Sequence, residues 1–251
     1  MSETRFDFFV YLWIAVGIVT LLFLIVRNIK APYGRHSSSQ WGPTMDNKWG
    51  WFWMEIPAVI VMPFLALSGP EEHSNYIWLL VVLWMIHYFN RVFVFPFRIR
   101  TKGKRIPVLI VISAFAFNLI NGFFNGYYLG HYSTPDLDII APNVLIGLIV
   151  FATGMIINHQ SDNILINLRK HSQGYQIPYG GLFRWVSCPN HFGEIIEWIG
   201  FAIVAWNLPA LSFAIWTFSN LVPRTLNHHQ WYKSNFEDYP KDRKAVFPGI
   251  L

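Results

Sequence analysis

Several polar side chains within residues 158–197 have the types and the spacing to bind one ligand together. On an ideal helix, with about 100° between successive residues, Asn158, Asp162 and Arg169 fall within about 40° of one another. Amide, carboxylate and guanidinium groups on a shared face suit a cofactor site at a membrane surface. The alternative interpretation is a solvated loop, which needs no shared face.

A pair of carboxyl groups lies farther along the same stretch. Glu194 and Glu197 are three residues apart and share a helix face, and Asn190 precedes them as the expected N-cap of their helix. The residues before this helix include glycines and a proline that predict a loop, namely Gly174, Pro178, Gly180 and Gly181. The stretch therefore predicts two helices that present polar groups, joined by a loop.

Two charged residues fall inside apolar segments, where each costs roughly 2.5–3.5 kcal/mol at a membrane centre. Glu55 lies near the start of one segment and Arg91 near the end of the next, with Tyr88 on the same helix face as Arg91. One interpretation is an ion pair between Glu55 and Arg91, with Tyr88 as an interfacial aromatic residue. The other is that Glu55 and Tyr88 donate hydrogen bonds to a substrate carbonyl, while Arg91 faces an anionic cofactor.

Polar residues recur at intervals of four near the C-terminal end, where Arg224, His228 and Tyr232 share one helix face. This face is either an interfacial polar cluster or a contact for phosphate or ribose. His228 and His229 are adjacent, which is a poor geometry for two ligands of one metal, so we expect no metal. The single cysteine, Cys188, excludes an internal disulfide.

The elements that must position these residues are membrane helices. Of 251 residues, 53% are hydrophobic and 13% are charged, and the mean hydropathy is +0.33. Five apolar runs are long enough, or nearly so, to cross a core ~30 Å thick as helices. These runs are residues 6–26, 51–67, 76–97, 106–129 and 139–157.

A further apolar run, residues 195–222, is interrupted by Asn207 and Pro209. It is interpreted as two shorter segments, either a helical hairpin or two thin spans. We therefore predict an all-α polytopic membrane protein with about seven transmembrane helices. Residues 1–251 are expected to form one domain, with the first helix retained rather than removed as a signal peptide.

Basic residues are concentrated in alternate loops, those after the first, third, fifth and seventh apolar segments. The opposite loops have neither Lys nor Arg and carry Glu71, Glu72, Asp136 and Asp138. Because loops rich in Lys and Arg remain in the cytoplasm, we predict the N-terminus outside and the C-terminus in the cytoplasm. The short basic loops do not form the single patch that nucleic acid requires, so we expect no nucleic-acid partner.

The sequence resembles the steroid 5α-reductase family of membrane-embedded, NADPH-dependent reductases. The strongest similarity lies in the C-terminal part, at residues 158–162, 168–170, 177–178 and 180–183, at 190–198, which begins Asn190-His191-Phe192-Gly193-Glu194, and at Phe236-Glu237-Asp238-Tyr239-Pro240. In the earlier helices, Glu55-Ile56-Pro57 is similar to the family's Gln-Glu-Leu-Pro, and residues 87–91 are similar to His-Tyr-Phe-His-Arg. The resemblance covers most of the chain.

The resemblance implies a seven-helix fold with NADPH bound on the cytoplasmic side. We expect a monomer in a bacterial inner membrane or an endoplasmic reticulum membrane. It also implies a Δ4-3-oxosteroid substrate that enters from the lipid, with its 3-oxo group held by Glu55 and Tyr88. The residues that would correspond to cofactor-binding residues are Arg91, Lys102, Lys104, Asn158, Asp162, Arg169, Tyr175, Asn190, Glu194, Arg224, His228 and Tyr232.

The sequence departs from the family pattern at a few positions. Met54 stands where the family has Gln before its glutamate, Asn90 replaces a histidine, and Asn227 and Gln230 alter a His-His-His-Arg run. Met54 lies on the substrate side of the expected site.

We therefore expect an NADPH-dependent reductase that transfers hydride to C5 of a 3-oxo-Δ4 steroid, while Glu55 and Tyr88 polarise the 3-oxo group. One alternative is a related membrane reductase of an enoyl or polyprenol-type lipid. A membrane methyltransferase that uses S-adenosylmethionine is a second, although its cofactor has no phosphates and needs fewer basic residues. A transporter or binding protein without catalytic activity is a third.

Overall fold

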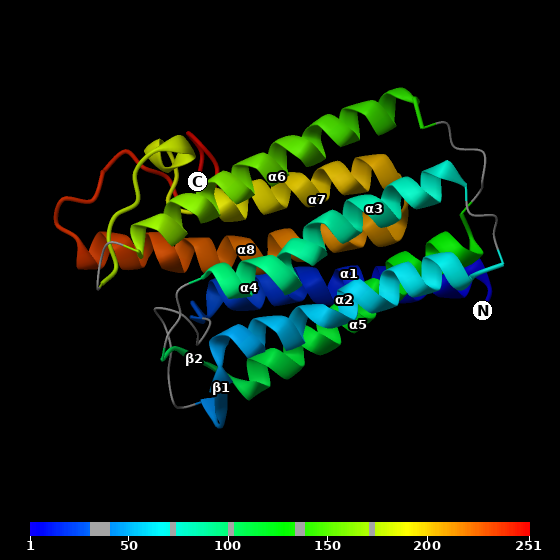
Figure 1. Ribbon diagram of the computed structural model, residues 1–251, viewed down its shortest axis with the longest axis horizontal. Coiled ribbons are helices and arrows are strands. Elements are labelled where there is room, and N and C mark those ends of the chain that lie inside the picture. Colours follow the sequence, from blue (N-terminus) through cyan, green and yellow to red (C-terminus); the bar gives the residue numbers. More distant parts are fainter. Residues whose placement is uncertain (31–40, 71–73, 100–102, 134–138, 171–173) are drawn as a thin grey trace. The chain divides into compact units, whose positions relative to one another are not determined.

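The computed structural model describes residues 1–30, 41–70, 74–99, 103–133, 139–170 and 174–251. Its α-helices are α1 Glu3–Val26, α2 Asn47–Ser68, α3 Asn75–Phe89, α4 Phe95–Arg98, α5 Val108–His131, α6 Pro142–Leu168, α7 Pro189–Ala205 and α8 Leu208–Asn235 (Figure 1). The shorter elements are a π-helix η3 Asn90–Val94, a 3-10 helix η4 Gly181–Arg184, and the strands β1 Thr44–Asp46 and β2 Arg105–Pro107. Lys102, Glu71, Glu72, Asp136 and Asp138 lie outside the described residues.

Within the described ranges, five helical segments are long and apolar enough to cross a membrane: α1, α2, α3 continued through α4, α5 and α6. They correspond to the five apolar runs predicted from the sequence. The interrupted run forms two separate helices, α7 with 17 residues and α8 with 28. Asn207 caps α8 by accepting a hydrogen bond from the backbone N–H of Ala210, and Pro209 lies in the first turn, where a missing N–H has no cost.

Two three-residue strands qualify the all-α prediction. β1 pairs with β2 in antiparallel register, with Thr44 opposite Pro107 and Asp46 opposite Arg105. The Arg105 guanidinium reinforces this pairing, because it donates to the Thr44 hydroxyl at 2.7 Å and to the Thr44 carbonyl at 2.6 Å. Asp46 then accepts from the backbone N–H of Lys48 at 2.9 Å and caps α2. The strands therefore fix where α2 and α5 begin.

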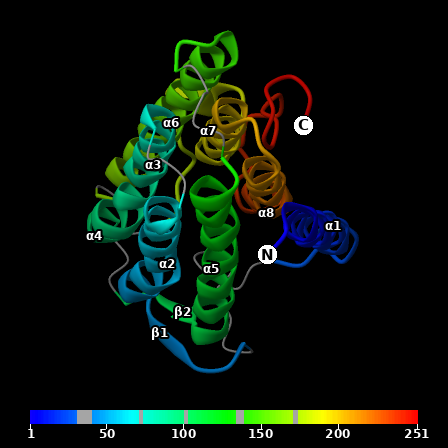
Figure 2. The ribbon, with the colours of Figure 1, turned by 90° about the vertical axis from the view of Figure 1, so that its right-hand side faces the viewer.

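The described residues form two compact units, one from Met1–Val10 and Ala31–Leu145 and the other from Tyr11–Lys30 and Ile146–Leu251. In the first unit α2 and α5 lie side by side (Figure 2). Their contact runs along a glycine stripe on α5 at Gly122, Gly126 and Gly130, spaced by four residues. A Cβ on Gly126 would lie 2.5 Å from the Met62 carbonyl oxygen of α2, so a larger residue has no room there.

α3 runs antiparallel to α2 in the same unit. The indole N–H of Trp84 on α3 donates to the carbonyl of Ala58 on α2 at 2.9 Å. α3 ends at Phe89, and the π-helix η3 continues the chain through Arg91 into α4. π-helical turns insert an extra residue, and they occur frequently at functional sites.

The second unit contains α6, α7 and α8 packed in chain order (Figure 1). α6 and α7 approach closely at glycines seven residues apart on each helix, Gly147 and Gly154 on α6 and Gly193 and Gly200 on α7. On the other side of α7, the indole of Trp198 lies edge-on against Phe213 of α8 at 4.4 Å between ring centroids.

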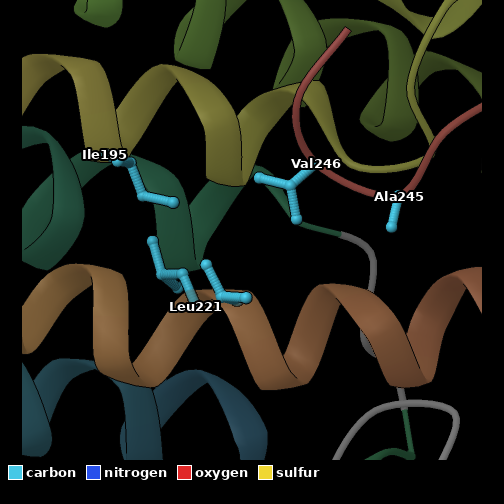
Figure 3. Packing of buried hydrophobic residues seen from close by; sticks show 5 residues of the cluster. Ile195, Leu221, Ala245 and Val246 are labelled. Atoms are coloured by element: carbon cyan, nitrogen blue, oxygen red, sulfur yellow. The ribbon is translucent and has the colours of Figure 1, made fainter. Parts of the chain in front are cut away.

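The C-terminal segment of the second unit returns to the helices. Ala245 and Val246 pack against Ile195 of α7 and Leu221 and Val222 of α8 (Figure 3). Val246 and Ile195 are almost completely buried. This apolar cluster holds residues 245–246 on α7 and α8.

Candidate active site

Glu55 and Tyr88 come from different helices of the first unit and share one hydrogen-bonding neighbour, Asn118 of α5. The Tyr88 hydroxyl donates to the Asn118 side-chain oxygen at 3.2 Å, and the Asn118 amide nitrogen donates to Glu55 Oε2 at 3.0 Å. Tyr88 is buried, Asn118 is buried and Glu55 is half-buried. The structure therefore brings together the phenol and the carboxyl that the sequence predicted to act as a pair.

Arg91 and Lys104 lie at the N-terminal end of α2. The Arg91 guanidinium lies over the rings of Trp51 and Phe95, 4.7 Å and 4.8 Å from their centroids. The Lys104 carbonyl accepts from the backbone N–H of Asn47, the first residue of α2. The sequence analysis placed Tyr88 and Arg91 on one helix face by assuming 3.6 residues per turn. The π-helix η3 begins between them, at Asn90, so this period does not hold as far as Arg91.

The second unit gathers another polar group where α6 meets α7. The Asn158 amide nitrogen donates to the Asn190 carbonyl at 3.0 Å and lies 3.4 Å from Glu194 Oε2. This contact is possible because Gly193 has no side chain, and a Cβ there would lie 2.5 Å from the Asn158 backbone nitrogen. Asp162, one helical turn beyond Asn158, is also buried. Of the predicted α6 face, Asn158 thus contacts Asn190 and Glu194 of α7.

Helix α7 begins two residues earlier than the sequence suggested. Cys188 is the N-cap and Pro189 occupies the first turn, so the prediction of Asn190 as the N-cap was wrong. Proline favours this position because its fixed φ suits the helix and its missing N–H is not needed there. Asn190 is thus a helical residue, and its carbonyl is the group that accepts from Asn158.

Helix α8 is joined to α7 beside the same group. His191 Nδ1 lies 2.6 Å from the Thr225 hydroxyl, and that hydroxyl donates to the Leu221 carbonyl at 2.8 Å. Because the single hydroxyl proton goes to Leu221, His191 Nδ1 carries a proton and donates to Thr225. The His191 ring also lies 5.8 Å from the ring of His228.

Two aromatic candidates lie near the end of α8. Tyr232 is buried and stacks on Tyr239 at 5.3 Å between ring centroids, in a cluster that also contains Ile177. The Tyr175 ring meets Trp231, the neighbour of Tyr232, at 5.2 Å. Arg169 lies directly after α6, with its backbone N–H still bonded to the Leu165 carbonyl.

The chain is similar in sequence to known proteins. A family model described as 3-oxo-5-alpha-steroid 4-dehydrogenase matches residues 104–251. The chain is 40% identical to steroid 5-alpha-reductase DET2 of Gossypium hirsutum, with 88% of this chain and 89% of the relative covered. It is 38% identical to 3-oxo-5-alpha-steroid 4-dehydrogenase 1 of Bos taurus (98% and 96% covered) and to that of Homo sapiens (96% and 93% covered).

The chain belongs to the steroid 5α-reductase family. It is therefore an enzyme, an oxidoreductase of this family. Its apolar helices fit an integral membrane protein.

Asn118 is a residue of this steroid 5α-reductase homologue that the sequence reasoning missed. Its signal was its spacing, because Asn118 precedes Gly122 by four residues and so continues the glycine stripe of α5 that faces α2. Met54, which departs from the family pattern, packs its side chain against Ile106 and Val111. The Met54 backbone carbonyl accepts from the Asn118 side chain at 2.7 Å. A side-chain amide therefore lies beside Glu55 and Tyr88, but it belongs to Asn118 of α5 and not to a glutamine at position 54.

The sequence reasoning also missed a polar cluster around Ser187, which is buried before α7. The Ser187 hydroxyl lies 2.6 Å from His229 Nδ1 and 2.6 Å from the Tyr239 hydroxyl, and it donates to the Lys244 carbonyl at 3.0 Å. Burial, with Lys233, Arg243 and Lys244 nearby, lowers the pKa of His229 from 6.5 to about 4. The cluster therefore links a neutral His229 on α8 to the chain before α7 and to the C-terminal segment.

Proposed function

We propose that this enzyme reduces the Δ4 double bond of a 3-oxosteroid with NADPH. The observation that carries the proposal is the shared contact of Tyr88 and Glu55 with Asn118. It places a phenol and a carboxyl next to each other inside membrane-spanning segments, where charged groups are costly without a function. The family names of the relatives, steroid 5-alpha-reductase and 3-oxo-5-alpha-steroid 4-dehydrogenase, support the substrate class.

The residues of the second unit fit a phosphorylated dinucleotide. Glu194 and Asp162 provide carboxylates that can accept from ribose hydroxyls, and Asn158 provides an amide that already bridges α6 and α7. Arg169 and Arg224 provide guanidinium groups, which match phosphate oxygens in geometry and charge. Tyr175, Asn190, His228 and Tyr232 would complete the cofactor residues of this unit. For Arg91, Lys102 and Lys104, a cofactor-binding role is proposed from the resemblance to the family and from their positive charge.

In the proposed reaction, Glu55 and Tyr88 act on the 3-oxo group. Bound NADPH would supply the hydride that adds to C5 of the enone, and a proton would add to C4 to complete the reduction. Negative charge then develops on the 3-oxo oxygen. A protonated Glu55 donates a hydrogen bond to it, and so does the Tyr88 hydroxyl, whose one proton turns from the Asn118 oxygen to the substrate oxygen. Held in a site that excludes water, these donors stabilise the transition state more than the ground state.

The proposed arrangement has the cofactor residues facing the cytoplasm and the N-terminus outside. It is supported by the basic loops after alternate apolar segments. The membrane is either a bacterial inner membrane or an endoplasmic reticulum membrane, and the steroid reaches the enzyme from the lipid.

The test is turnover by the purified protein in detergent. The protein is incubated with NADPH and a panel of Δ4-3-oxosteroids, enoyl lipids and polyprenol-type lipids, and the products are identified by mass spectrometry. We expect a saturated 3-oxosteroid of 5α configuration. Consumption of NADPH with an enoyl or polyprenol-type lipid alone would contradict the steroid assignment.

A further inference from the structure

The amide of Asn118 has a single orientation in the structure, and its neighbours determine it. Its nitrogen donates to the Met54 backbone carbonyl at 2.7 Å, and a carbonyl oxygen can only accept. The amide nitrogen must therefore face α2, where its second hydrogen reaches Glu55 Oε2 at 3.0 Å. The amide oxygen is left facing α3 and accepts from the Tyr88 hydroxyl at 3.2 Å.

The burial of Asn118 makes this orientation difficult to change. Asn118 is 4% exposed and lies on the α5 face that packs closely on α2 through Gly122 and Gly126. Turning the amide over would place its oxygen against the Met54 carbonyl oxygen, two acceptors with no hydrogen between them. Leaving a buried polar group without a partner costs about 1–3 kcal/mol.

We propose that Asn118 is a positioning residue that holds the Tyr88 hydroxyl and the Glu55 carboxyl in the geometry needed to meet one substrate oxygen. This inference rests on the proposed function. One amide fixes two side chains from two helices, and its own orientation is fixed by the main chain of the residue before Glu55. Asn118 thereby supplies an amide in a chain that has Met54 where the family pattern has Gln.

The main test compares Asn118→Leu with a matched control, Asn125→Leu. Asn125 is buried on the same helix, two turns away, and its amide donates to the Asn121 carbonyl of that helix. Because a misplacement of about 1 Å can reduce a rate by about 10²-fold, we expect Asn118→Leu to lower kcat at least about tenfold with little change in NADPH affinity. Asn125→Leu should keep a kcat close to that of the wild type.

A double mutant separates positioning from a merely structural role. If Asn118 acts through Tyr88, adding Asn118→Leu to a Tyr88→Phe enzyme should lower kcat by less than about threefold, because the group being positioned is already gone. A structural defect would lower kcat by the same factor in both backgrounds. The affinity for the steroid, measured without cofactor by quenching of Trp fluorescence, should change less than kcat.

Asn118→Asp provides a second variant of nearly the same shape should the leucine variant fail to fold. It keeps an oxygen that accepts from Tyr88 and removes both N–H donors, so kcat should again fall at least about tenfold. Two results would overturn the role of Asn118 and leave the proposed function standing. These are wild-type kcat in the Asn118 variants, or an equal loss of kcat from Asn118→Leu in the wild-type and Tyr88→Phe backgrounds. A wild-type enzyme that reduces no Δ4-3-oxosteroid with NADPH would overturn the proposed function, and this inference with it.

Discussion

Tyr88 and Glu55 give the first prediction at the level of single residues. Loss of one donor to a developing oxyanion typically costs about 10²–10³ in rate, so Tyr88→Phe should lower steroid turnover at least tenfold while leaving NADPH binding nearly intact. Glu55→Gln should do the same, because it keeps the shape but replaces a carboxylic acid with a weaker amide donor. The measurement is single-turnover rate, NADPH affinity and melting temperature on the same preparations. If the pair served only to balance Arg91, Tyr88→Phe would keep wild-type turnover and Glu55→Gln would mainly lower the melting temperature.

Arg169 tests the choice between NADPH and NADH. A 2′-phosphate adds negative charge that a guanidinium can pair with, so Arg169→Ala should weaken NADPH binding and leave the weaker NADH binding almost unchanged. Lys170 is the matched control, because it is the adjacent cation, is exposed and donates to Asn167 at 2.8 Å. Equal affinities of the wild-type enzyme for the two cofactors, measured by titration, would contradict this assignment.

His229 predicts how stability depends on pH. Its pKa is about 4 in the folded protein and about 6.5 in an unfolded chain, so between these values the unfolded state binds more protons. The free energy of unfolding should therefore fall as the pH is lowered from about 6.5 to about 4. In melting curves recorded across this range, His229→Gln should lose stability less steeply than the wild type, and parallel profiles would exclude His229 as a source.

At the same scale, the sequence identified most candidate residues but not the groups that hold them. Glu55 and Asn158 could be recognised because a charge in an apolar run and an amide on a polar face are visible in the sequence. The roles of Asn118 and Ser187 could not, because they depend on neighbours 30 to 64 residues away in the chain. Conversely, the N-cap of α7 was predicted wrongly. Asn is a preferred N-cap residue and Cys is not, but Pro189 favours the first turn of a helix and so places the N-cap at Cys188.

At the level of elements, helix lengths were predictable and helix contacts were not. A hydrophobic run of about 20 residues directly indicates a membrane helix, and all five long runs appear as such helices in the described residues. The pairing of α2 with α5, and of α6 with α7, depends on glycines that allow close approach. Glycines spaced by four and by seven residues were visible in the sequence, but their partner helices were not.

Gly126 tests whether close packing of α5 on α2 stabilises the first unit. Valine at this position would place a Cβ 2.5 Å from the Met62 carbonyl oxygen and force the two helices apart. We expect Gly126→Val to lower the melting temperature and to reduce turnover, because Asn118 lies two turns away on the same face. Ala116→Val on the exposed side of α5 is the control and should melt like the wild type. Equal melting temperatures for the two variants would exclude a close-packed interface at Gly126.

At the level of the whole molecule, each unit shows helices that reverse direction in chain order. In the first unit, α2 and α5 run in the same direction, because Met54 lies near Asn118 and Met62 near Gly126, and α3 runs the opposite way. In the second unit, Gly154 packs on Gly193 and Gly147 on Gly200, so α6 and α7 are antiparallel. His191 contacts Thr225 and Trp198 contacts Phe213, which makes α7 and α8 antiparallel as well.

These directions favour a chain that crosses the membrane at every long helix. As a crossing, α7 would be the shortest, since its 17 residues extend for roughly 26 Å against a core of ~30 Å. Slight thinning of the bilayer accommodates such a difference at a modest cost. If α7 and α8 both cross, we expect an odd number of crossings, with the two ends of the chain on opposite sides.

The topology prediction follows from these directions together with the distribution of basic loops. Residues 98–105 and 224–244 are rich in Lys and Arg, and both should be cytoplasmic, which places the C-terminus inside and the N-terminus outside. Reporters that are active on only one side of the membrane, fused to each end in turn, should give opposite signals, with the cytoplasmic signal at the C-terminus.

Cysteines introduced at Lys233 and at Ser74 provide a check in the native chain, because only the first should be protected from a thiol reagent that cannot cross the membrane. A protected Ser74 position, or two ends on the same side, would overturn both the crossing of α7 and the cytoplasmic placement of the cofactor residues.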